Sequence, residues 1–390
     1  MREGWEYKKL GEVGTFLRGK SIQKADFVEH GLPCIHYGQI HTKFGVSVDK
    51  HLSEIPEEVY NKSIIASPGD VVIAITSEDL DGSCKSTAWL GDYDVAVSSH
   101  AAVYKHNLNP KFIAYYLRSN SFYVEKGKYA RGFKVMEIKP TDIARIPIPL
   151  PSEEIQSRVV AELDKINELI RLKKEQLKDY DNLAQSIFYE MFGDPVVNEK
   201  GWEVKHIGDF GTCIAGATPS TTVEEYWING TIPWLSSGEV SKGRIFNTDK
   251  RITQHGYNSC STRMIPAHTI VIAMAGQGKT RGTVGVAEIP LCTNQSICSI
   301  VTNEKIDVDF LYYQIKFLYN ELRSASNGDG GRGGLNLRLI QKFPIISPNY
   351  SIQVSFAKRI KTVELLKSNI QTTIADLETL LASRMQYWFD

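Results

Sequence analysis

The side chains most able to do chemistry in this sequence are amides, basic groups and hydroxyls in short polar clusters between apolar runs. Asn and Gln match the hydrogen-bonding edge of adenine, and Arg matches guanine or a phosphate. One such residue alone is more often a turn former, so the prediction rests on the set. The candidate nucleic-acid contacts are Arg18, Lys20, Gln39, Ser99, His100, Lys128, Arg131, Lys134, Ser237, Lys279, Arg281, Asn294, Gln295 and Arg332.

Positive charge is concentrated in two stretches, although the chain as a whole is neutral. Its 390 residues include 45 Lys and Arg and 45 Asp and Glu. Residues 111–145 contain eight basic and three acidic residues, and residues 316–342 contain five and two. Gly-rich segment 328–334 would let the backbone approach a phosphate. The overall balance excludes a histone-like polycation, and the local surplus favours anion-binding loops over surface loops with solvated charges.

A search for catalytic motifs finds one candidate, and its context argues against catalysis. Residues 273–280 fit a relaxed Walker A pattern after a predicted strand, with Lys279 as the phosphate-binding lysine. A P-loop needs a following helix whose N-terminus meets the phosphates, whereas residues 281–286 are Gly-rich and β-prone. The nine His and six Cys show no metal-ligand spacing. We expect a non-enzyme that binds no cofactor or metal itself, with an NTPase as the less favoured alternative.

The composition is typical of a soluble globular protein of the cytoplasm. Hydrophobic residues make up 42% of the chain and charged residues 23%, and both values are ordinary for globular domains. The first ten residues lack the apolar segment of a secretory signal, and the longest apolar runs are far too short to span a membrane. The six cysteines include no CxxC pair, which indicates reduced thiols. We therefore expect a cytoplasmic chain without a membrane partner.

An internal repeat with an offset of 197 residues organises the chain. Residues 4–15 recur as residues 201–212, and the Pro-rich segment 146–151 recurs as 343–348. In each copy, short β-branched runs alternate with Gly, Pro, Asn and Ser, which predicts strands of a compact α+β domain. The predicted elements are two similar domains at residues 1–151 and 195–348 and one helix in each, near residues 112–119 and 310–319.

Each domain is followed by a long segment with a heptad pattern of apolar residues. The two segments, residues 152–194 and 349–390, contain no Pro, and apolar residues recur every three or four positions. This spacing is typical of a coiled-coil seam, and helices of about 37 residues would be on the order of 55 Å long. Neither helix can bury its stripe alone, so we expect the two to pack on each other. The seam residues are Leu163, Ile166, Ile170, Leu177, Ile187, Ile360, Val363, Ile370, Leu377 and Leu381.

The doubled order of these features resembles the specificity subunits of type I restriction-modification enzymes. Gly-Trp-Glu opens both copies, the Pro-rich segments continue into Ile155-Gln156 and Ile352-Gln353, and the long helical segments end in Phe192-Gly193-Asp194 and Phe389-Asp390. The resemblance covers the whole chain. It implies an α+β fold in which two recognition domains, related by a pseudo-two-fold, are joined by an antiparallel coiled coil. Each domain would read one half of a split, asymmetric DNA site.

The resemblance further implies partners for the chain. These are double-stranded DNA, two methyltransferase subunits that bind S-adenosylmethionine, and restriction subunits with translocase and nuclease activity that use ATP and Mg. In this interpretation the coiled coil sets the spacer between the half-sites and docks the methyltransferase subunits, while the chain itself binds no cofactor. The non-enzymatic alternative is a coiled-coil adaptor with two protein-binding domains.

Overall fold

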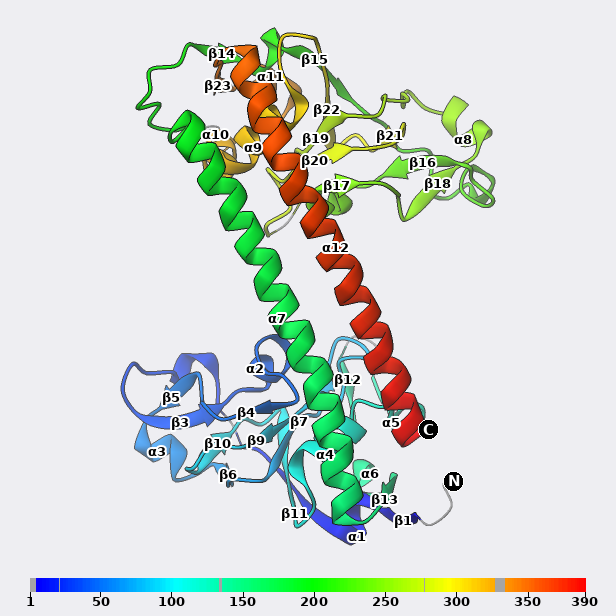
Figure 1. Ribbon diagram of the computed structural model, residues 1–390. Coiled ribbons are helices and arrows are strands. Elements are labelled where there is room, and N and C mark those ends of the chain that lie inside the picture. The colour runs from blue at the N-terminus through cyan, green and yellow to red at the C-terminus, as the bar shows by residue number, and fades with distance from the viewer. Residues whose placement is uncertain (1–4, 21, 133–134, 277, 327–333) are drawn as a thin grey trace. The chain divides into compact units, whose positions relative to one another are not determined.

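The chain forms two compact units in the computed structural model. The first unit contains residues 1–174 and 372–390, and the second contains residues 175–371. Two long helices, α7 (Glu153–Phe192) and α12 (Tyr350–Phe389), each have one part in either unit (Figure 1). The structure describes residues 5–20, 22–132, 135–276, 278–326 and 334–390.

The first unit contains a domain of strands and short helices. In chain order its elements are β1 (Glu6–Lys9), α1 (Leu10–Val13), β2 (Gly14–Arg18), η1 (Lys24–Asp26), β3 (Leu32–Ile35), α2 (Tyr37–Thr42), β4 (Ser47–Val48), β5 (Ser53–Ile55), α3 (Glu57–Tyr60), β6 (Ile64–Ala66), β7 (Val71–Ala74), β8 (Thr76–Ser77), β9 (Ser86–Trp89), β10 (Val95–Val97), β11 (Ala101–His106), α4 (Pro110–Tyr116), α5 (Asn120–Gly127), β12 (Met136–Glu137), α6 (Pro140–Ile143) and β13 (Pro147–Leu150). A five-stranded sheet has the order β2-β11-β7-β9-β4, and a four-stranded sheet has the order β5-β3-β10-β6. The Pro-rich strand β13 pairs with the opening strand β1, so both ends of the domain meet.

Strand β7 shows why the apolar runs of this domain are continuous rather than alternating. Val71 and Ile73 point into the core that also contains Phe112 of α4, whereas Val72 and Ala74 belong to a separate core. Successive side chains of a strand point to opposite faces, so a wholly apolar strand requires a core on each side of the sheet.

The second unit repeats this construction. In chain order its elements, apart from the long helices, are β14 (Val204–His206), η2 (Ile207–Asp209), β15 (Gly211–Ala215), η3 (Glu224–Tyr226), β16 (Ile232–Leu235), η4 (Ser237–Lys242), β17 (Arg244–Ile245), β18 (Lys250–Ile252), α8 (Gln254–Asn258), β19 (Thr269–Ala273), β20 (Val284–Ala287), β21 (Cys292–Thr293), β22 (Ile297–Thr302), α9 (Val308–Phe317), α10 (Tyr319–Ala325), α11 (Leu337–Gln341) and β23 (Pro344–Ile346). Its five-stranded sheet, β15-β22-β19-β20-β17, also ends in a parallel edge pair, and β19 again divides its side chains between two cores. The predicted α+β fold with an internal repeat is confirmed.

The helix expected after the sheet strands is present in both copies, and a second short helix follows each one after a division. The sequence predicts one helix near residues 112–119 and one near 310–319, which α4 and α9 confirm, whereas α5 and α10, which follow them, were not predicted. In the first copy the division follows from Ser119, whose Oγ accepts a hydrogen bond from the backbone N–H of Phe122 at 3.2 Å. A serine in this role starts a new helix and ends the previous one.

A buried glutamine joins each long helix to its domain. Oε1 of Gln156 accepts a hydrogen bond from the backbone N–H of Asn109, the N-cap of α4, at 3.2 Å, and its Nε2 donates to the carbonyl of the proline that ends the exit segment. Gln353 repeats both bonds, with the backbone N–H of Asp307, the N-cap of α9, at 2.9 Å. The matching glutamines of the sequence repeat therefore mark one structural junction made twice.

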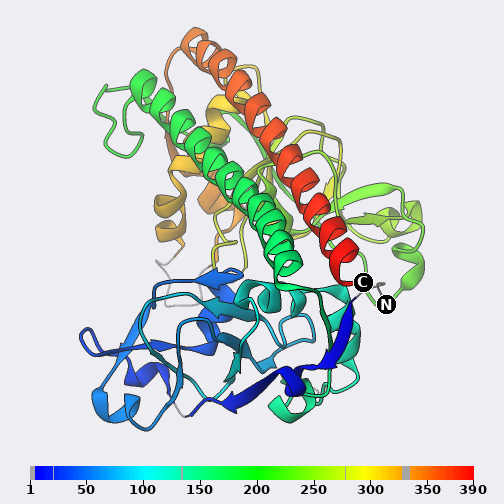
Figure 2. The ribbon, with the colours of Figure 1, turned by 60° about the horizontal axis from the view of Figure 1, so that its bottom comes forward.

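Within each unit the two long helices run antiparallel (Figure 2). In the first unit, Glu162 pairs with Arg384, and Lys174 lies 2.8 Å from Glu378. In the second unit, Lys367 lies 2.9 Å from Asp181. Residues nearer the C-terminal end of α7 thus pair with residues nearer the N-terminal end of α12. Each helix has 40 residues, which corresponds to about 60 Å.

The apolar stripes of the long helices are buried partly against the domains, which the sequence did not predict. Val159 and Leu163 of α7 and Trp388 of α12 join the core of the first unit, whereas Phe188 and Phe356 join that of the second. Among the predicted seam residues, Leu163, Ile166, Ile170, Ile360, Val363 and Ile370 are buried, and Leu177, Ile187, Leu377 and Leu381 are half-buried.

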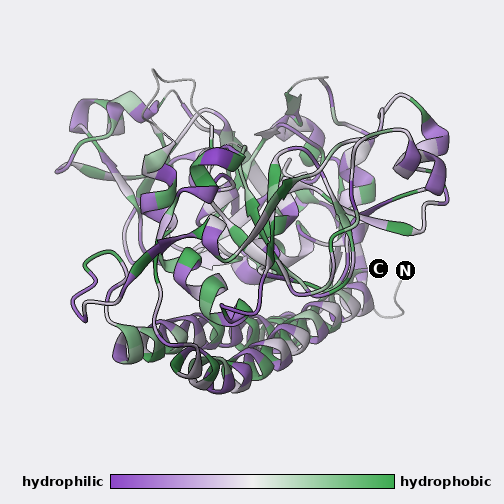
Figure 3. Cartoon of the chain, turned by 90° about the horizontal axis from the view of Figure 1, so that it is seen from above, coloured by the Kyte–Doolittle hydropathy of each residue, from purple (hydrophilic) through white to green (hydrophobic). Residues whose placement is uncertain are grey.

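Both long helices alternate hydrophilic and hydrophobic residues along their length (Figure 3). Among the described residues, no helix combines the length and the hydropathy that a membrane crossing requires.

Candidate nucleic-acid interface

In the first unit, the end of β2 meets the turn between β10 and β11. Arg18 is the last residue of β2; its Nε lies 3.5 Å from the carbonyl oxygen of Ser99, and its guanidinium lies 2.9 Å from the Glu137 carboxylate. A Cβ at Gly19 would collide with the carbonyl oxygen of Ser98, so only glycine permits this close approach. Lys20 follows as an exposed side chain.

Aromatic and imidazole rings adjoin this turn. The Tyr37 ring lies 4.9 Å from that of the exposed His100 and 6.1 Å from that of His41. The backbone N–H of Tyr37 donates to Ser98 Oγ at 2.9 Å, which fixes α2 against the turn. Burial, followed by Lys24 and His100, lowers the pKa of His36, consistent with a neutral ring whose Nδ1 accepts a hydrogen bond from the backbone.

Together these residues define a surface that we call the first polar cluster. It consists of Arg18, Lys20, Tyr37, His41, Ser99, His100 and Arg131, the last placed by a strand bridge to Glu137. The prediction included Arg18, Lys20, Ser99, His100 and Arg131, and the structure brings them together. It did not include Tyr37 or His41, although their spacing of four residues is the sequence signal that two side chains share a helix face.

Gln39 is occupied within the fold. Its Oε1 accepts from the backbone N–H of His36 at 3.0 Å, and its Nε2 donates to Ser53 Oγ at 2.7 Å. In the second unit, Glu239 accepts from the backbone N–H of Ser236 in the same capping role, at 3.1 Å. Helix capping therefore accounts for Gln39 and its counterpart without a nucleic acid.

The basic stretch 111–145 does not form one patch, because the fold uses much of its charge. Lys128 lies 2.6 Å from Glu125, and Lys126 donates to the carbonyl of Ser83 at 2.6 Å. Lys111, Arg118 and Arg145 also have protein partners. These partners are distant in sequence in several cases, so the charge count alone could not reveal them. Lys134 lies outside the described residues.

The second unit builds a corresponding turn between β21 and β22. A Cβ at Gly216 would collide with the carbonyl oxygen of Thr293, as at Gly19 in the first unit. Asn294 Oδ1 accepts from the backbone N–H of Ser296 at 3.1 Å, and the exposed Gln295 accepts from Thr218 Oγ1. Gln295 also lines a pocket of about 470 Å³ together with Arg338, a residue outside the predicted set. Ser237 is the first residue of η4 and is half-buried.

The loop after β19 carries two more predicted basic residues, Lys279 and Arg281. Lys279 is exposed, and its carbonyl accepts a hydrogen bond from the hydroxyl of Tyr319 at 2.8 Å. Arg323 donates to the carbonyls of Gly278 at 2.8 Å and of Arg281 at 3.1 Å, so α10 holds the loop. Strand β20 follows the loop where a P-loop would have a helix, as the sequence indicated. Arg332 lies outside the described residues.

The described side chains offer no group of three or more His, Cys, Asp or Glu residues placed to hold a metal ion. Both turns instead present hydrogen-bonding side chains beside a strand that a glycine lets approach closely, and the first turn adds basic and aromatic side chains. Such a surface can contact phosphates and base edges.

Comparison with known proteins gives consistent matches. The family model of the type I restriction modification DNA specificity domain matches residues 2–179 and 199–379. The EcoR124I/EcoR124II specificity subunit of Escherichia coli is 25% identical over 289 residues, covering 72% of this chain and 69% of the relative. The MjaIX specificity subunit of Methanocaldococcus jannaschii is 34% identical over 134 residues, covering 33% of this chain and only 30% of that relative.

Solved structures show the same fold. A type I restriction-modification S subunit from M. genitalium has a TM-score of 0.57 at 14% sequence identity and covers 99% of this chain and 96% of its own. A structure from work on complex assembly and conformational transition of the type I restriction-modification system has a TM-score of 0.56 at 19% identity, covering 99% and 97%.

Proposed function

Since the chain belongs to the family of type I restriction modification DNA specificity domains, we propose that it is the DNA-reading subunit of such a system and that each unit reads one half of a bipartite site. The observation that carries this proposal is the repeated turn. Gly19 and Gly216 hold the same close approach, but the side chains beside them differ. Arg18 ends β2 where Ala215 ends β15. Unequal side chains on equal scaffolds predict unequal half-sites.

We further propose that the chain has no catalytic role. Two methyltransferase subunits, which bind S-adenosylmethionine, would dock on α7 and α12, and restriction subunits that use ATP and Mg would join them. The relatives are named specificity subunits, which supports this division of labour.

Selection of DNA sites from a random duplex library by the chain with its methyltransferase subunit tests the proposal. We expect a split motif. Combined Arg18→Ala and His100→Ala substitutions should relax one half of the motif by about 1–3 kcal/mol per lost base contact and leave the other half unchanged. Lys8→Ala, which removes a charge on β1, is the matched control. If the parent chain selects no preferred sequence, the adaptor alternative is supported. If the double variant loses both halves of the motif, the assignment of one unit to each half is refuted.

The length of the helix pair should set the spacer. Seven residues inserted into α7 after Lys174 and seven into α12 after Gln371 add about 10 Å of helix. Because ten base pairs span roughly 34 Å, we expect the preferred spacer to grow by about three base pairs. An unchanged spacer in the same selection would contradict this role of the helices.

A further inference from the structure

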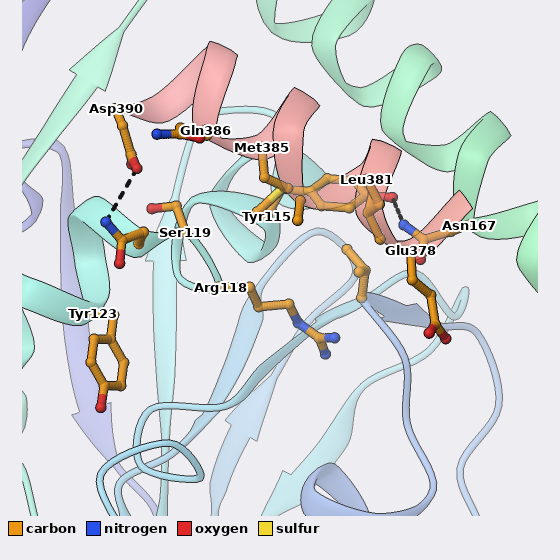
Figure 4. A pocket seen from close by; sticks show the side chains of 13 residues that line it. Tyr115, Arg118, Ser119, Tyr123, Asn167, Glu378, Leu381, Met385, Gln386 and Asp390 are labelled. Atoms are coloured by element: carbon orange, nitrogen blue, oxygen red, sulfur yellow. Dashed lines mark hydrogen bonds between the residues drawn. The ribbon is translucent and has the colours of Figure 1, made fainter. Parts of the chain in front are cut away.

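The first unit contains a pocket of about 610 Å³ between its domain and the long helices (Figure 4). Leu381 and Met385 of α12 form its apolar side, together with Tyr115 of α4, and Arg118 and Glu378 bring opposite charges to its lining. The volume lies within the range of sites that enclose most of a bound group.

The internal repeat identifies the equivalent region of the second unit. Helices α4 and α9 begin at caps with identical hydrogen bonds to the buried glutamines. Counting from these caps, Arg118 corresponds to Lys316, and Ser119 corresponds to Phe317. The two units can therefore be compared residue by residue.

The second unit fills this space with aromatic rings. Counting back from the helix ends, Met385 and Gln386 of α12 correspond to Phe188 and Tyr189 of α7. The Phe317 ring centroid lies 5.2 Å from that of Phe188 and 5.8 Å from that of Tyr189. The first unit has an unbranched thioether, an amide and a serine where the second has three interlocking rings.

The charges around the space also differ. In the second unit, Lys316 Nζ lies 3.0 Å from the Asp181 carboxylate. Their counterparts in the first unit, Arg118 and Glu378, both line the pocket but bond elsewhere: the guanidinium donates to two backbone carbonyls, and Glu378 pairs with Lys174 at 2.8 Å. The ion pair between these two positions thus forms in the second unit but not in the first.

Arg118 retains an unused hydrogen-bonding group. Its buried Nε has no hydrogen-bond partner among the described residues, and its acceptors are carbonyls rather than carboxylates. A carboxylate would give a stronger, charge-assisted bond. An aromatic ring, as in the second unit, and a carboxylate next to Arg118 would complement this lining.

We propose that the pocket is a docking site for a partner methyltransferase subunit, which inserts an aromatic side chain flanked by an acidic residue. This inference rests on the proposed function, in which the methyltransferase subunits dock on the long helices. It adds that the two docking sites are unequal, because the packed rings of Phe188, Tyr189 and Phe317 occupy the corresponding region of the second unit. A ring buried in a well-formed pocket is the usual anchor of a protein interface.

The test fills the pocket with the residues that the protein uses in its second unit. Met385→Phe combined with Gln386→Tyr should weaken binding of one methyltransferase subunit at least tenfold and leave the other unchanged. Ser383→Tyr, an exposed position on the same turn outside the pocket, is the matched control. Native mass spectrometry gives the number of bound subunits, titration calorimetry gives both affinities, and a thermal unfolding midpoint no lower than that of the parent chain shows that the variant is folded.

The outcomes separate the inference from the proposed function. A parent chain that binds no methyltransferase subunit refutes the proposed function. A parent chain and a filled variant that both bind two subunits with the same affinities overturn the pocket proposal alone. Equal weakening by Ser383→Tyr also overturns it, because added bulk on the helix rather than loss of the pocket would be the cause.

Discussion

The junctions between domain and long helices share a buried glutamine but differ in the chemistry around it. In the first unit, the Tyr115 hydroxyl donates to Asp164 at 2.8 Å, and Lys111 Nζ lies 2.7 Å from the same carboxylate. Both members of that ion pair are about a third exposed. The ion pair of this junction is therefore accessible to water.

The second junction contains a network of buried charges. Arg244 donates to Glu288 at 2.6 Å and also bonds to Asp309, while Glu364 lies 3.8 Å from its Nε. Glu364 in turn lies 3.0 Å from Lys367 of the same helix. Three carboxylates thus surround one arginine whose side chain is only 20% exposed.

This difference teaches that a repeated fold does not require repeated bonds. Removal of one member of a buried ion pair leaves its partner charged and unsolvated, whereas removal of a solvated member costs little. The second junction is therefore intolerant of change. The first has space beside its long helices, so it is the one suited to contact with another protein.

Arg244→Met should separate the two junctions most clearly. It strands buried carboxylates, so we expect a loss of about 3–5 kcal/mol in the free energy of unfolding. Lys111→Met, which removes the cation of the solvated ion pair at the first junction, should cost less than about 1 kcal/mol. Urea unfolding followed by circular dichroism measures both. Similar losses would show that the junctions do not differ as the charges indicate.

Gln156→Leu and Gln353→Leu test what the junctions share. Each leaves a buried backbone N–H and a carbonyl without its partner, for which we expect a cost of about 2 kcal/mol. The two losses should agree to within roughly 0.5 kcal/mol, because the two glutamines make the same bonds. A large inequality, measured by the same urea titrations, would limit the equivalence of the copies to their geometry.

Acid should weaken the second junction. Burial alone would raise the pKa of Glu364, but Lys367, Tyr313 and Arg244 together hold it below its ordinary value of 4.5. The pKa of Asp181 is likewise lowered: burial opposes the shift, and Lys316 and Lys367 outweigh it. A lowered carboxylate pKa contributes stability that is present above the ordinary value and lost as the pH falls through the lowered one.

We therefore expect the free energy of unfolding to decline below about pH 4.5, and Glu364→Gln to flatten that decline. Urea titrations at fixed pH values from about 3 to about 7 span the ordinary carboxyl pKa values and measure this decline. An equal decline in the parent chain and in the variant would remove Glu364 as its cause.

The smallest expected effect concerns phosphate contacts. Lys20→Ala and Lys279→Ala remove exposed charges near the two turns, so each should weaken DNA binding roughly threefold on all sequences and reduce the salt slope by about one. Fluorescence anisotropy at several salt concentrations tests this. A change in sequence preference would instead assign a base contact, and nucleotide hydrolysis abolished by Lys279→Ala would revive the NTPase alternative.

The repeat could be predicted from the sequence because both copies keep the residues that form the same structural contacts. Gln156 and Gln353 stood at matching positions, and the structure gives them identical bonds. The partners of the basic residues could not be predicted from the sequence. Lys126, for example, donates a hydrogen bond to the carbonyl of Ser83, more than forty positions away. Likewise, heptad spacing predicted that α7 and α12 pair, but it could not show that Phe188 packs into a domain core.

For the candidate site, the sequence supplied residue types but not their surroundings. Ser99 and His100 lie 81 or more positions after Arg18, and only the sheet brings them next to it. Gln39 had a suitable side chain, but the fold uses its amide for a cap. Whether an amide is exposed or consumed depends on tertiary contacts, which a local pattern does not contain.

Because of the last turn of α12, the two units become complete at different times during translation. Trp388 and Phe389 belong to the core of the first unit, and Asp390 accepts a hydrogen bond from the backbone N–H of Ser121. The second unit is one continuous segment, residues 175–371, whereas the first needs residues that leave the ribosome only after that segment. At roughly 5–20 residues per second, its core stays open for on the order of 10–40 s. The unit that begins the chain is thus the later of the two to be completed.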